Sequence, residues 1–148
     1  MPDPTPVSRP LTLVMELKAP ELRPQLEGTI TTLQKQAANP VGGALTSLGI
    51  VHFARFVFVT DTHFAVITDY DGDLTRYVQE FANTVGVIFD QLLTFVKDAP
   101  PLPVNAHPDE FLSFVQKYDR PSVVPFYSAY PDLTVQDILT LRNRQSKP

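Results

Sequence analysis

The sequence predicts an α+β fold in which helices pack on an antiparallel sheet. Three observations lead to this class. Apolar residues alternate with period two over residues 11–18, as in a half-buried strand. Two runs rich in valine and phenylalanine, residues 51–59 and 64–70, flank a short polar stretch, which is typical of a β-hairpin. Apolar residues at helical spacing then follow over residues 74–92.

The N-terminal third is expected to hold one strand and one helix. Residues 1–10 are rich in proline, which fixes φ and removes a donor, so we expect an extended arm. The strand at 11–18 follows. A helix is predicted over residues 21–36, because Leu22, Leu26, Ile30 and Leu33 share one face. The stretch "ANPVGGALTS", residues 38–47, is interpreted as a loop.

The C-terminal half is expected to hold three helices and one strand. A long helix covers residues 74–96, with Gly86 as a candidate break, and a second runs over 108–118 with proline at its first position. Residues 123–130 are predicted to form an edge strand, because Pro125 cannot donate to a central ladder. The pattern from Thr134 to Asp137 then predicts a capped short helix.

This order of elements is the ferredoxin-like arrangement with an inserted helix and a C-terminal helical extension. At 148 residues the chain has the length of one domain. We therefore expect an arm at 1–10, a single domain at 11–142 and a frayed tail at 143–148. The strand at 51–59 is apolar on both faces. Its second face must be covered by the additional helices, by a ligand or by a second copy of the sheet.

Composition removes several classes of function. The chain has no cysteine, which excludes disulfides, thiolate metal sites and a thiol nucleophile. Its net charge of −4 without a long basic run argues against nucleic-acid binding. The N-terminus lacks the pattern of a signal peptide, and no apolar run approaches the length of a membrane span. We expect a cytoplasmic protein without nucleic-acid or membrane partners.

The layout over residues 11–130 resembles the dimeric α+β barrel superfamily, in which two ferredoxin-like subunits pack sheet against sheet. The strings "VHFARF", "DYDGDL" and "FYSAYPDLTVQDI" also resemble segments of uncharacterised bacterial proteins of unknown function. The resemblance implies a homodimer with a cleft beside the sheet. Because the superfamily includes haem-using peroxidases, haem-degrading enzymes, cofactor-free monooxygenases and ligand binders, it selects no single activity.

The hairpin places polar side chains in one of two ways. A two-residue turn pairs residues whose numbers sum to 123 and sets His52 opposite Asp71, as a general base and its orienting carboxylate. A three-residue loop makes the sum 122, with Phe53 opposite Asp69 and Arg55 diagonal to that acid in an ion pair. Because side chains alternate, His52 and Arg55 point to opposite faces unless a bulge redirects one.

We take His52 and Asp71 as the candidate catalytic pair, and Arg55, Asp69 and Tyr127 as candidate ligand contacts. Each has a structural alternative: a histidine satisfied at a strand end, an arginine clamp on a carboxylate, or an aromatic of the core or an interface. The acidic run at residues 69–73 does not fit a calcium loop, because its glycine falls at the fourth position rather than the sixth. No metal site is predicted.

The sequence thus predicts a homodimer that binds a small apolar or aromatic ligand in a cleft by the sheet. One alternative is an oxidative enzyme of the same fold, either a cofactor-free monooxygenase or a haem-dependent enzyme, with His52 as base or axial ligand. Another is a structural or regulatory partner domain. No residue pattern requires a cofactor, although haem fits the resemblance.

Overall fold

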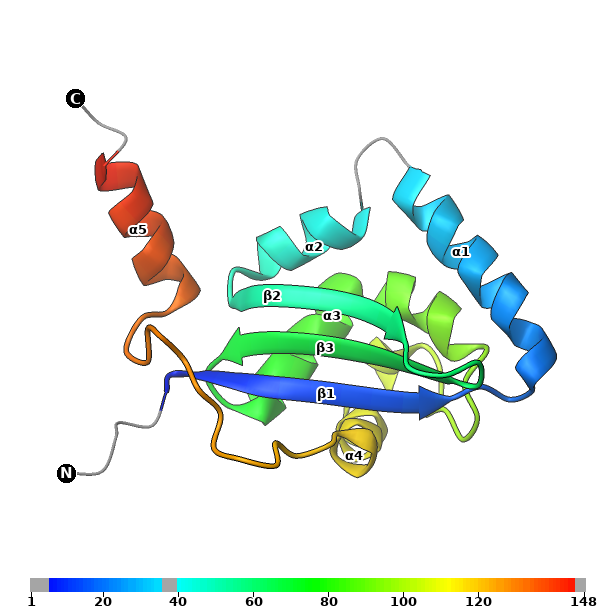
Figure 1. The fold of residues 1–148 in the computed structure, drawn as a ribbon. Helices are drawn as coiled ribbons and strands as arrows, with labels where there is room; N and C mark the ends of the chain where they lie inside the picture. Colours follow the sequence, from blue (N-terminus) through cyan, green and yellow to red (C-terminus); the bar gives the residue numbers. More distant parts are fainter. Residues whose placement is uncertain (1–5, 36–39, 146–148) are drawn as a thin grey trace.

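Three strands form the sheet of the computed structural model, which describes residues 6–35 and 40–145 (Figure 1). They are β1 (Ser8–Glu16), β2 (Val51–Phe58) and β3 (His63–Asp71), arranged in the order β1-β3-β2 with both pairs antiparallel. The three strands expected from alternation and β-propensity are confirmed. The strand β1 begins earlier than predicted and includes Pro10, which lies on an edge strand where a missing donor is tolerated.

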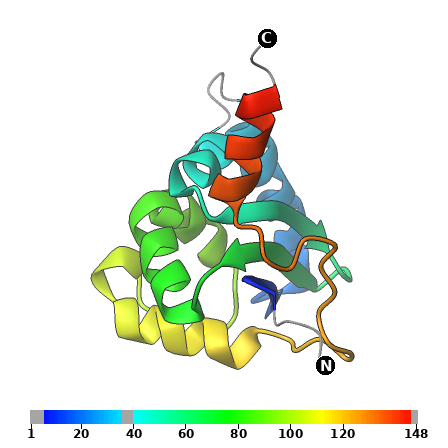
Figure 2. The same ribbon diagram turned by 90° about the vertical axis from the view of Figure 1, so that its left-hand side faces the viewer.

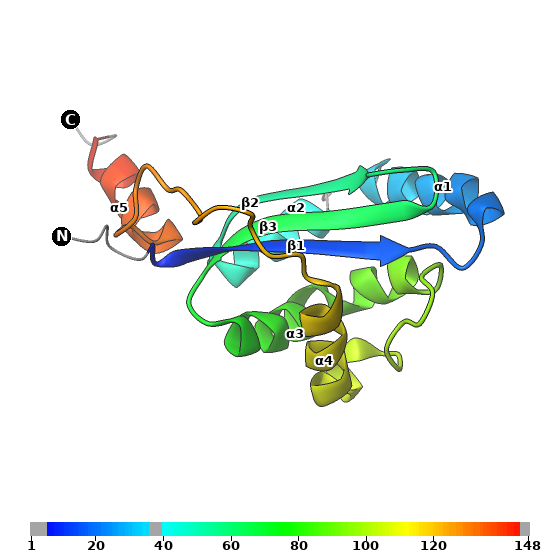
Figure 3. The ribbon, with the colours of Figure 1, turned by 60° about the horizontal axis from the view of Figure 1, so that its bottom comes forward.

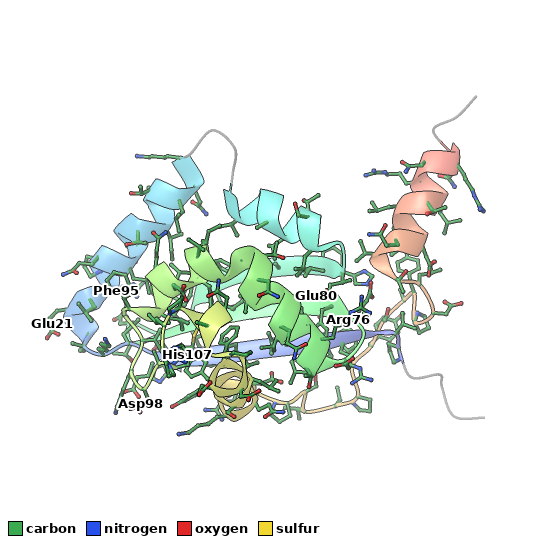
Figure 4. The ribbon with its side chains drawn as sticks, turned by 180° about the vertical axis from the view of Figure 1, so that it is seen from behind. Glu21, Arg76, Glu80, Phe95, Asp98 and His107 are labelled. Carbon is green, nitrogen blue, oxygen red and sulfur yellow. The ribbon has the colours of Figure 1, made fainter. Side chains whose placement is uncertain are left out.

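One face of the sheet carries the core. Helices α3 (Leu74–Leu93) and α4 (Pro108–Tyr118) cover this face, which is the far side in Figure 1 and the near side in Figure 4. Alternate strand residues point into it, and the rings of Tyr77, Phe81 and Phe89 from α3 pack over them. On the solvent side of α3, Arg76 and Glu80, labelled in Figure 4, form an ion pair of 2.9 Å. The amphipathic pattern of α3 therefore determines which sheet face is buried.

A further pair of helices extends the core beyond β2. The short 3₁₀ helix η1 (Pro20–Leu22) leads into α1 (Arg23–Lys35), as predicted. The expectation of a loop at 38–47 is wrong, because α2 (Pro40–Leu48) is helical there. Two adjacent glycines each cost a helix about 1 kcal/mol and mask its periodicity. Packing of Ala44, Leu45 and Leu48 against the core offsets that cost.

Gly86 does not break α3, which runs uninterrupted to Leu93. A Cβ atom at Gly86 would lie 3.1 Å from Cγ2 of Val104, which belongs to the 3₁₀ helix η2 (Val104–Ala106). Val104 is fully buried. The glycine is therefore explained by the close approach of η2, not by a change in helix direction.

The predicted edge strand at 123–130 is wrong. Residues 119–134, the connecting segment, run from α4 along the outer edge of β1 but form no strand (Figure 1). Arg120 N–H donates to the Thr12 carbonyl at 2.8 Å, and Val7 N–H donates to the Pro131 carbonyl at 2.8 Å. Between these anchors the segment advances eleven residues while β1 advances five, so it bows outward. Continuous pairing also fails because Pro125 has no N–H to donate.

The α+β class is confirmed, while the place of a fourth strand beside β1 is taken by this connecting segment. The chain ends in α5 (Val135–Gln145), which projects beyond the end of the sheet and has no buried residue (Figures 1 and 2). The predicted cap is confirmed: Asp137 N–H donates to Thr134 Oγ1 at 3.1 Å, and Thr134 N–H donates to Asp137 Oδ2 at 3.0 Å. The helix α5 passes residue 142 and runs into the expected tail, whose last three residues lie outside the described part.

Candidate functional site

The register of the hairpin decides how the polar residues meet. From Phe53 opposite Asp69 to Phe58 opposite Phe64, paired residues sum to 122, which is the register of the three-residue loop. The next pair is Val51 with Tyr70, so the register shifts by one and His52 is the additional residue of a bulge. A bulge redirects a side chain that alternation alone would send to the other face.

His52 and Asp71 contact each other because of this bulge. The Nε2 atom of His52 lies 2.6 Å from Oδ1 of Asp71, and the two side chains are only 12% and 10% exposed. The other carboxylate oxygen of Asp71 accepts the backbone N–H of Val135 at 2.8 Å. Asp71 therefore joins β2, β3 and the start of α5. The pair was predicted from the sequence, but the contact with Val135 was not, because a main-chain donor 64 residues away leaves no side-chain signal.

This junction is reinforced by a second contact beside it. Gln136 Nε2 donates to the Gly49 carbonyl at 2.9 Å, and Asp71 N–H donates to the Ile50 carbonyl at 2.8 Å. Gly49 has φ of +74°, a conformation that side chains with a Cβ rarely adopt. Since both carboxylate oxygens of Asp71 have partners, the arrangement is suited to holding α5 in place.

Arg55 and Asp69 do not form the predicted ion pair. Arg55 is exposed and pairs across the strand with Ile67, and no ion pair joins it to any carboxylate in the described part of the chain. Residues that lie diagonally across two strands are about 7–8 Å apart. A direct contact between two such side chains restricts their rotamers, which costs conformational entropy. The predicted structural clamp of Arg55 on Asp69 is therefore wrong within one chain.

The side chain of Asp69 is partly buried. Burial raises the pKa of its carboxyl group, and the nearby His52 acts in the opposite direction. Because Arg55, Asp69 and Asp71 all belong to the sheet face away from α3, the bulge brings His52 to the same face as Arg55. The expected separation of these two side chains onto opposite faces holds only for an unbulged strand.

The face opposite the core, here called the open face, is covered by no helix among residues 6–35 and 40–145 (Figures 1 and 3). Its cross-strand rows follow from the register: Pro10–Asp69–Phe53, Thr12–Ile67–Arg55 and Val14–Ala65–Val57. Phe53 is 75% exposed and Val59, just beyond β2, is 55% exposed.

Tyr127 lies at a different place, in a groove between the edge of β1 and the bowed connecting segment. The groove has a volume of about 750 Å³. Its walls are mainly proline and aromatic residues, with Ser8, Arg9 and Tyr70 among those that carry polar groups. Tyr127 is 82% exposed. This exposure excludes a place in the core for Tyr127, while the interface role stays a prediction.

Arg9 is the functional candidate that sequence reasoning missed. It is exposed, lies opposite Tyr70 in the sheet and makes no ion pair among the described residues. Burial raises the pKa of the Tyr70 phenol, and the positive charge of Arg9 opposes that shift. Arg9 belongs to the segment 1–10 that the sequence predicts as an extended arm, whereas the strand β1 already begins at Ser8.

The structure thus separates the candidate residues into three places. His52 and Asp71 form the junction with α5, Arg55 and Asp69 lie on the open face, and Tyr127 lines the groove. Among the described residues, no three His, Asp or Glu side chains gather closely enough to hold a metal ion. No helix of the described ranges has the length and apolarity needed to cross a membrane.

Comparison with protein-family models, with curated proteins and with solved structures finds no match to this chain. The resemblance to the dimeric α+β barrel superfamily therefore stays a prediction.

Proposed function

We propose that the protein binds a small aromatic ligand carrying an acidic group, in the groove between β1 and the connecting segment. The observation that carries this proposal is the groove itself. Its volume of about 750 Å³ lies within the range of roughly 300–1,000 Å³ that is typical of small-molecule sites. Tyr127, a ligand-contact candidate from the sequence, lines this groove.

The lining of the groove supports this ligand class. Pro10, Pro125, Phe126 and Tyr127 offer flat apolar surfaces against which an aromatic ring packs. The guanidinium of Arg9 has no ion-pair partner among residues 6–35 and 40–145, and a guanidinium binds a carboxylate or sulfonate with two parallel hydrogen bonds. A neutral aromatic molecule would use only the first of these features. The acidic group is therefore part of the proposal.

The test uses 1-naphthoate as the acidic probe and 1-naphthalenemethanol as its neutral counterpart. We expect naphthoate to shift the backbone amide NMR signals of Arg9 and residues 126–128, and to bind more tightly than the alcohol. Arg9→Gln should remove that preference, and Tyr127→Ala should weaken both probes. Tyr130→Ala is the matched control, because Tyr130 is 63% exposed in the same segment but does not line the groove.

The result that would overturn the proposal is equally direct. If neither probe shifts the signals of the groove residues at millimolar concentration, or if the shifts map to Phe53 on the open face, the groove is not the ligand site. A preference for naphthoate that survives Arg9→Gln would remove the acidic group from the proposal.

We also propose that the protein is a homodimer through the open face. The supporting observation is the exposure of Phe53 and Val59 beside Val14, Val57 and Ile67 on a face without a covering helix. Contiguous apolar surface of this kind marks interaction sites. Sedimentation velocity at about 50 μM should show a dimer, since a dimer with a Kd near 1 μM is almost fully formed there. A monomer at this concentration contradicts the proposal.

The oxidative-enzyme alternative draws on the contact of His52 with Asp71. A haem-ligating histidine needs a ring nitrogen directed at iron, but Nε2 of His52 is directed at Asp71, in a junction that also holds α5. These residues do not fit that role, and we derive no haem chemistry from them. Absorption of the purified protein near the Soret band checks this assignment, and a strong band would reverse it.

A further inference from the structure

We propose that two copies of the chain recognise each other through reciprocal ion pairs, in which Arg55 of each protomer contacts Asp69 of the partner subunit. This inference rests on the homodimer proposed above and names the residues that select the partner. On the open face, Arg55 and Asp69 lie close together. Neither has an ion-pair partner within the described part of its own chain.

The arrangement of four residues on the open face makes this face complementary to itself. Phe53 lies opposite Asp69, and Arg55 lies opposite Ile67 on the same two strands. These four positions form a parallelogram with Arg55 and Asp69 at the ends of one diagonal and Phe53 and Ile67 at the ends of the other. Neighbouring strands are about 4.8 Å apart and alternate residues about 6.8 Å apart, so the two sides differ by about 2 Å.

A two-fold axis fits this parallelogram along its apolar diagonal. If the axis runs along the line from Phe53 to Ile67, in the plane between two stacked faces, it brings each charged position to within about 3 Å, in that plane, of the opposite charge of the other protomer. The long side chain of arginine spans this offset. Each Arg55 then faces Asp69 of the partner subunit, and the exposed ring of Phe53 meets its own copy. One rotation therefore satisfies both charges and buries the most exposed apolar ring of the sheet.

The surroundings of the two charges favour this partner over an unrelated one. Asp69 is half-buried beside Phe53, and the stacking of a second face removes more water from it, which strengthens an ion pair with a well-placed guanidinium. The other charged groups of the open face are His52 and Asp71, which are paired with each other, and Glu16 and His63 at the far end. A partner without alternating charges would leave Asp69 buried and unpaired, which is costly.

The size of the face sets the expected affinity. Three strands of eight or nine residues, spaced about 4.8 Å apart with a rise of about 3.3 Å per residue, span roughly 400 Å² per protomer. Specific interfaces commonly bury about 800 Å² per partner. We therefore expect a dimer with a micromolar Kd, in which two reciprocal ion pairs determine whether association is detected.

The experiment is a charge exchange followed by sedimentation velocity over about 1–200 μM. Arg55→Glu and Asp69→Arg each bring like charges together twice in a homodimer, so each should raise the Kd by at least about 100-fold. An equimolar mixture of the two variants should form a heterodimer, and the double variant R55E/D69R should again form a homodimer. Lys35→Glu, which makes the same charge change on the exposed side of α1, is the matched control and should dimerise normally.

The outcomes separate this inference from the proposals on which it rests. A wild-type dimer that persists in both single variants overturns the reciprocal pairing but leaves the homodimer intact. A wild-type monomer over the whole range overturns both, while the naphthoate experiment tests the groove independently. Should Asp69→Arg fail to fold, Asp69→Asn replaces it and should still weaken the dimer by about tenfold. No change in Kd with Asp69→Asn contradicts the pairing.

Discussion

Removal of the Asp71 carboxylate should detach α5 and destabilise the whole chain. In Asp71→Ala, the Val135 N–H and the His52 ring both lose their acceptor in a part-buried position. Hydrogen bonds to a charged group contribute about 1.5–3 kcal/mol each, and a buried donor without an acceptor costs about 1–3 kcal/mol. Because the start of α5 can move and expose its N–H to water, we expect a loss of about 2–4 kcal/mol, below the sum of the separate costs.

The assay combines a global and a local measurement. Urea denaturation followed by circular dichroism gives the free energy of unfolding, and amide hydrogen exchange reports on α5 alone. Asp71→Asn is the informative comparison: its side-chain oxygen still accepts from Val135, and its amide donates to a neutral His52 ring. We expect it to cost about 1 kcal/mol. Asp132→Ala, an exposed acid of the connecting segment, should change nothing.

Two results would refute this reasoning. A free energy of unfolding for Asp71→Ala within about 0.5 kcal/mol of wild type would mean that the junction contributes no stability. Unchanged exchange rates at the first turn of α5 would mean that Asp71 does not hold this helix, even if the chain were destabilised. In the second case His52 and Asp71 would again be candidates for chemistry.

Four further substitutions follow from the structure. Gly28→Ala should stabilise the chain by about 0.5–1 kcal/mol in thermal unfolding, because Gly28 is helical and a new Cβ there would enter open space. Gly49→Ala should destabilise the chain, because Gly49 has φ of +74° and Gln136 Nε2 lies 3.0 Å from the new Cβ. Phe89→Ala should cost about 3–5 kcal/mol in urea denaturation, because the ring is 1% exposed; a loss below about 1 kcal/mol would contradict its place in the core. Burial raises the pKa of the Asp119 carboxyl group above its unfolded value near 3.8. The stability that this group contributes is therefore fully present below pH 3.8, and it is lost as the pH rises through the pKa of the folded state. Asp119→Asn, which keeps an acceptor for the Thr12 N–H, should therefore raise the unfolding midpoint at pH 7 and have no effect near pH 3.

The sequence was sufficient to predict a helix or strand where the local residue pattern agrees with the way that element packs. Alternation predicted β1 and helical spacing predicted α1 and α3, because each element buries one face and its residues must follow that period. Proline at its first position predicted α4. A capping pattern predicted the start of α5, where Thr134 and Asp137 cap each other. The start of α3 is capped in a similar way, because the Asp73 side chain accepts the Arg76 N–H at 2.9 Å. These signals act within a few residues, so no tertiary information is needed to read them.

Local patterns failed where a distant contact decides the conformation. The double glycine of α2 disfavours a helix until α3 supplies a surface for it. Valine and tyrosine favour a strand at 123–130, yet the segment has too many residues between its two anchors on β1 to pair in register. In both cases the energy of packing or the geometry of the ends outweighs a propensity of about 1 kcal/mol per residue or less.

The candidate sites show the same division. The amino-acid sequence by itself determined that His52 and Asp71 belong to one hairpin and that one sheet face is left apolar, because both follow from residue order and period. Only the tertiary structure decided that a bulge brings His52 to Asp71, that Val135 is the third partner, and that Arg9 and Tyr127 line one groove. A bulge changes the pairing by one residue at little local cost, and contacts between distant segments depend on where the whole chain places them.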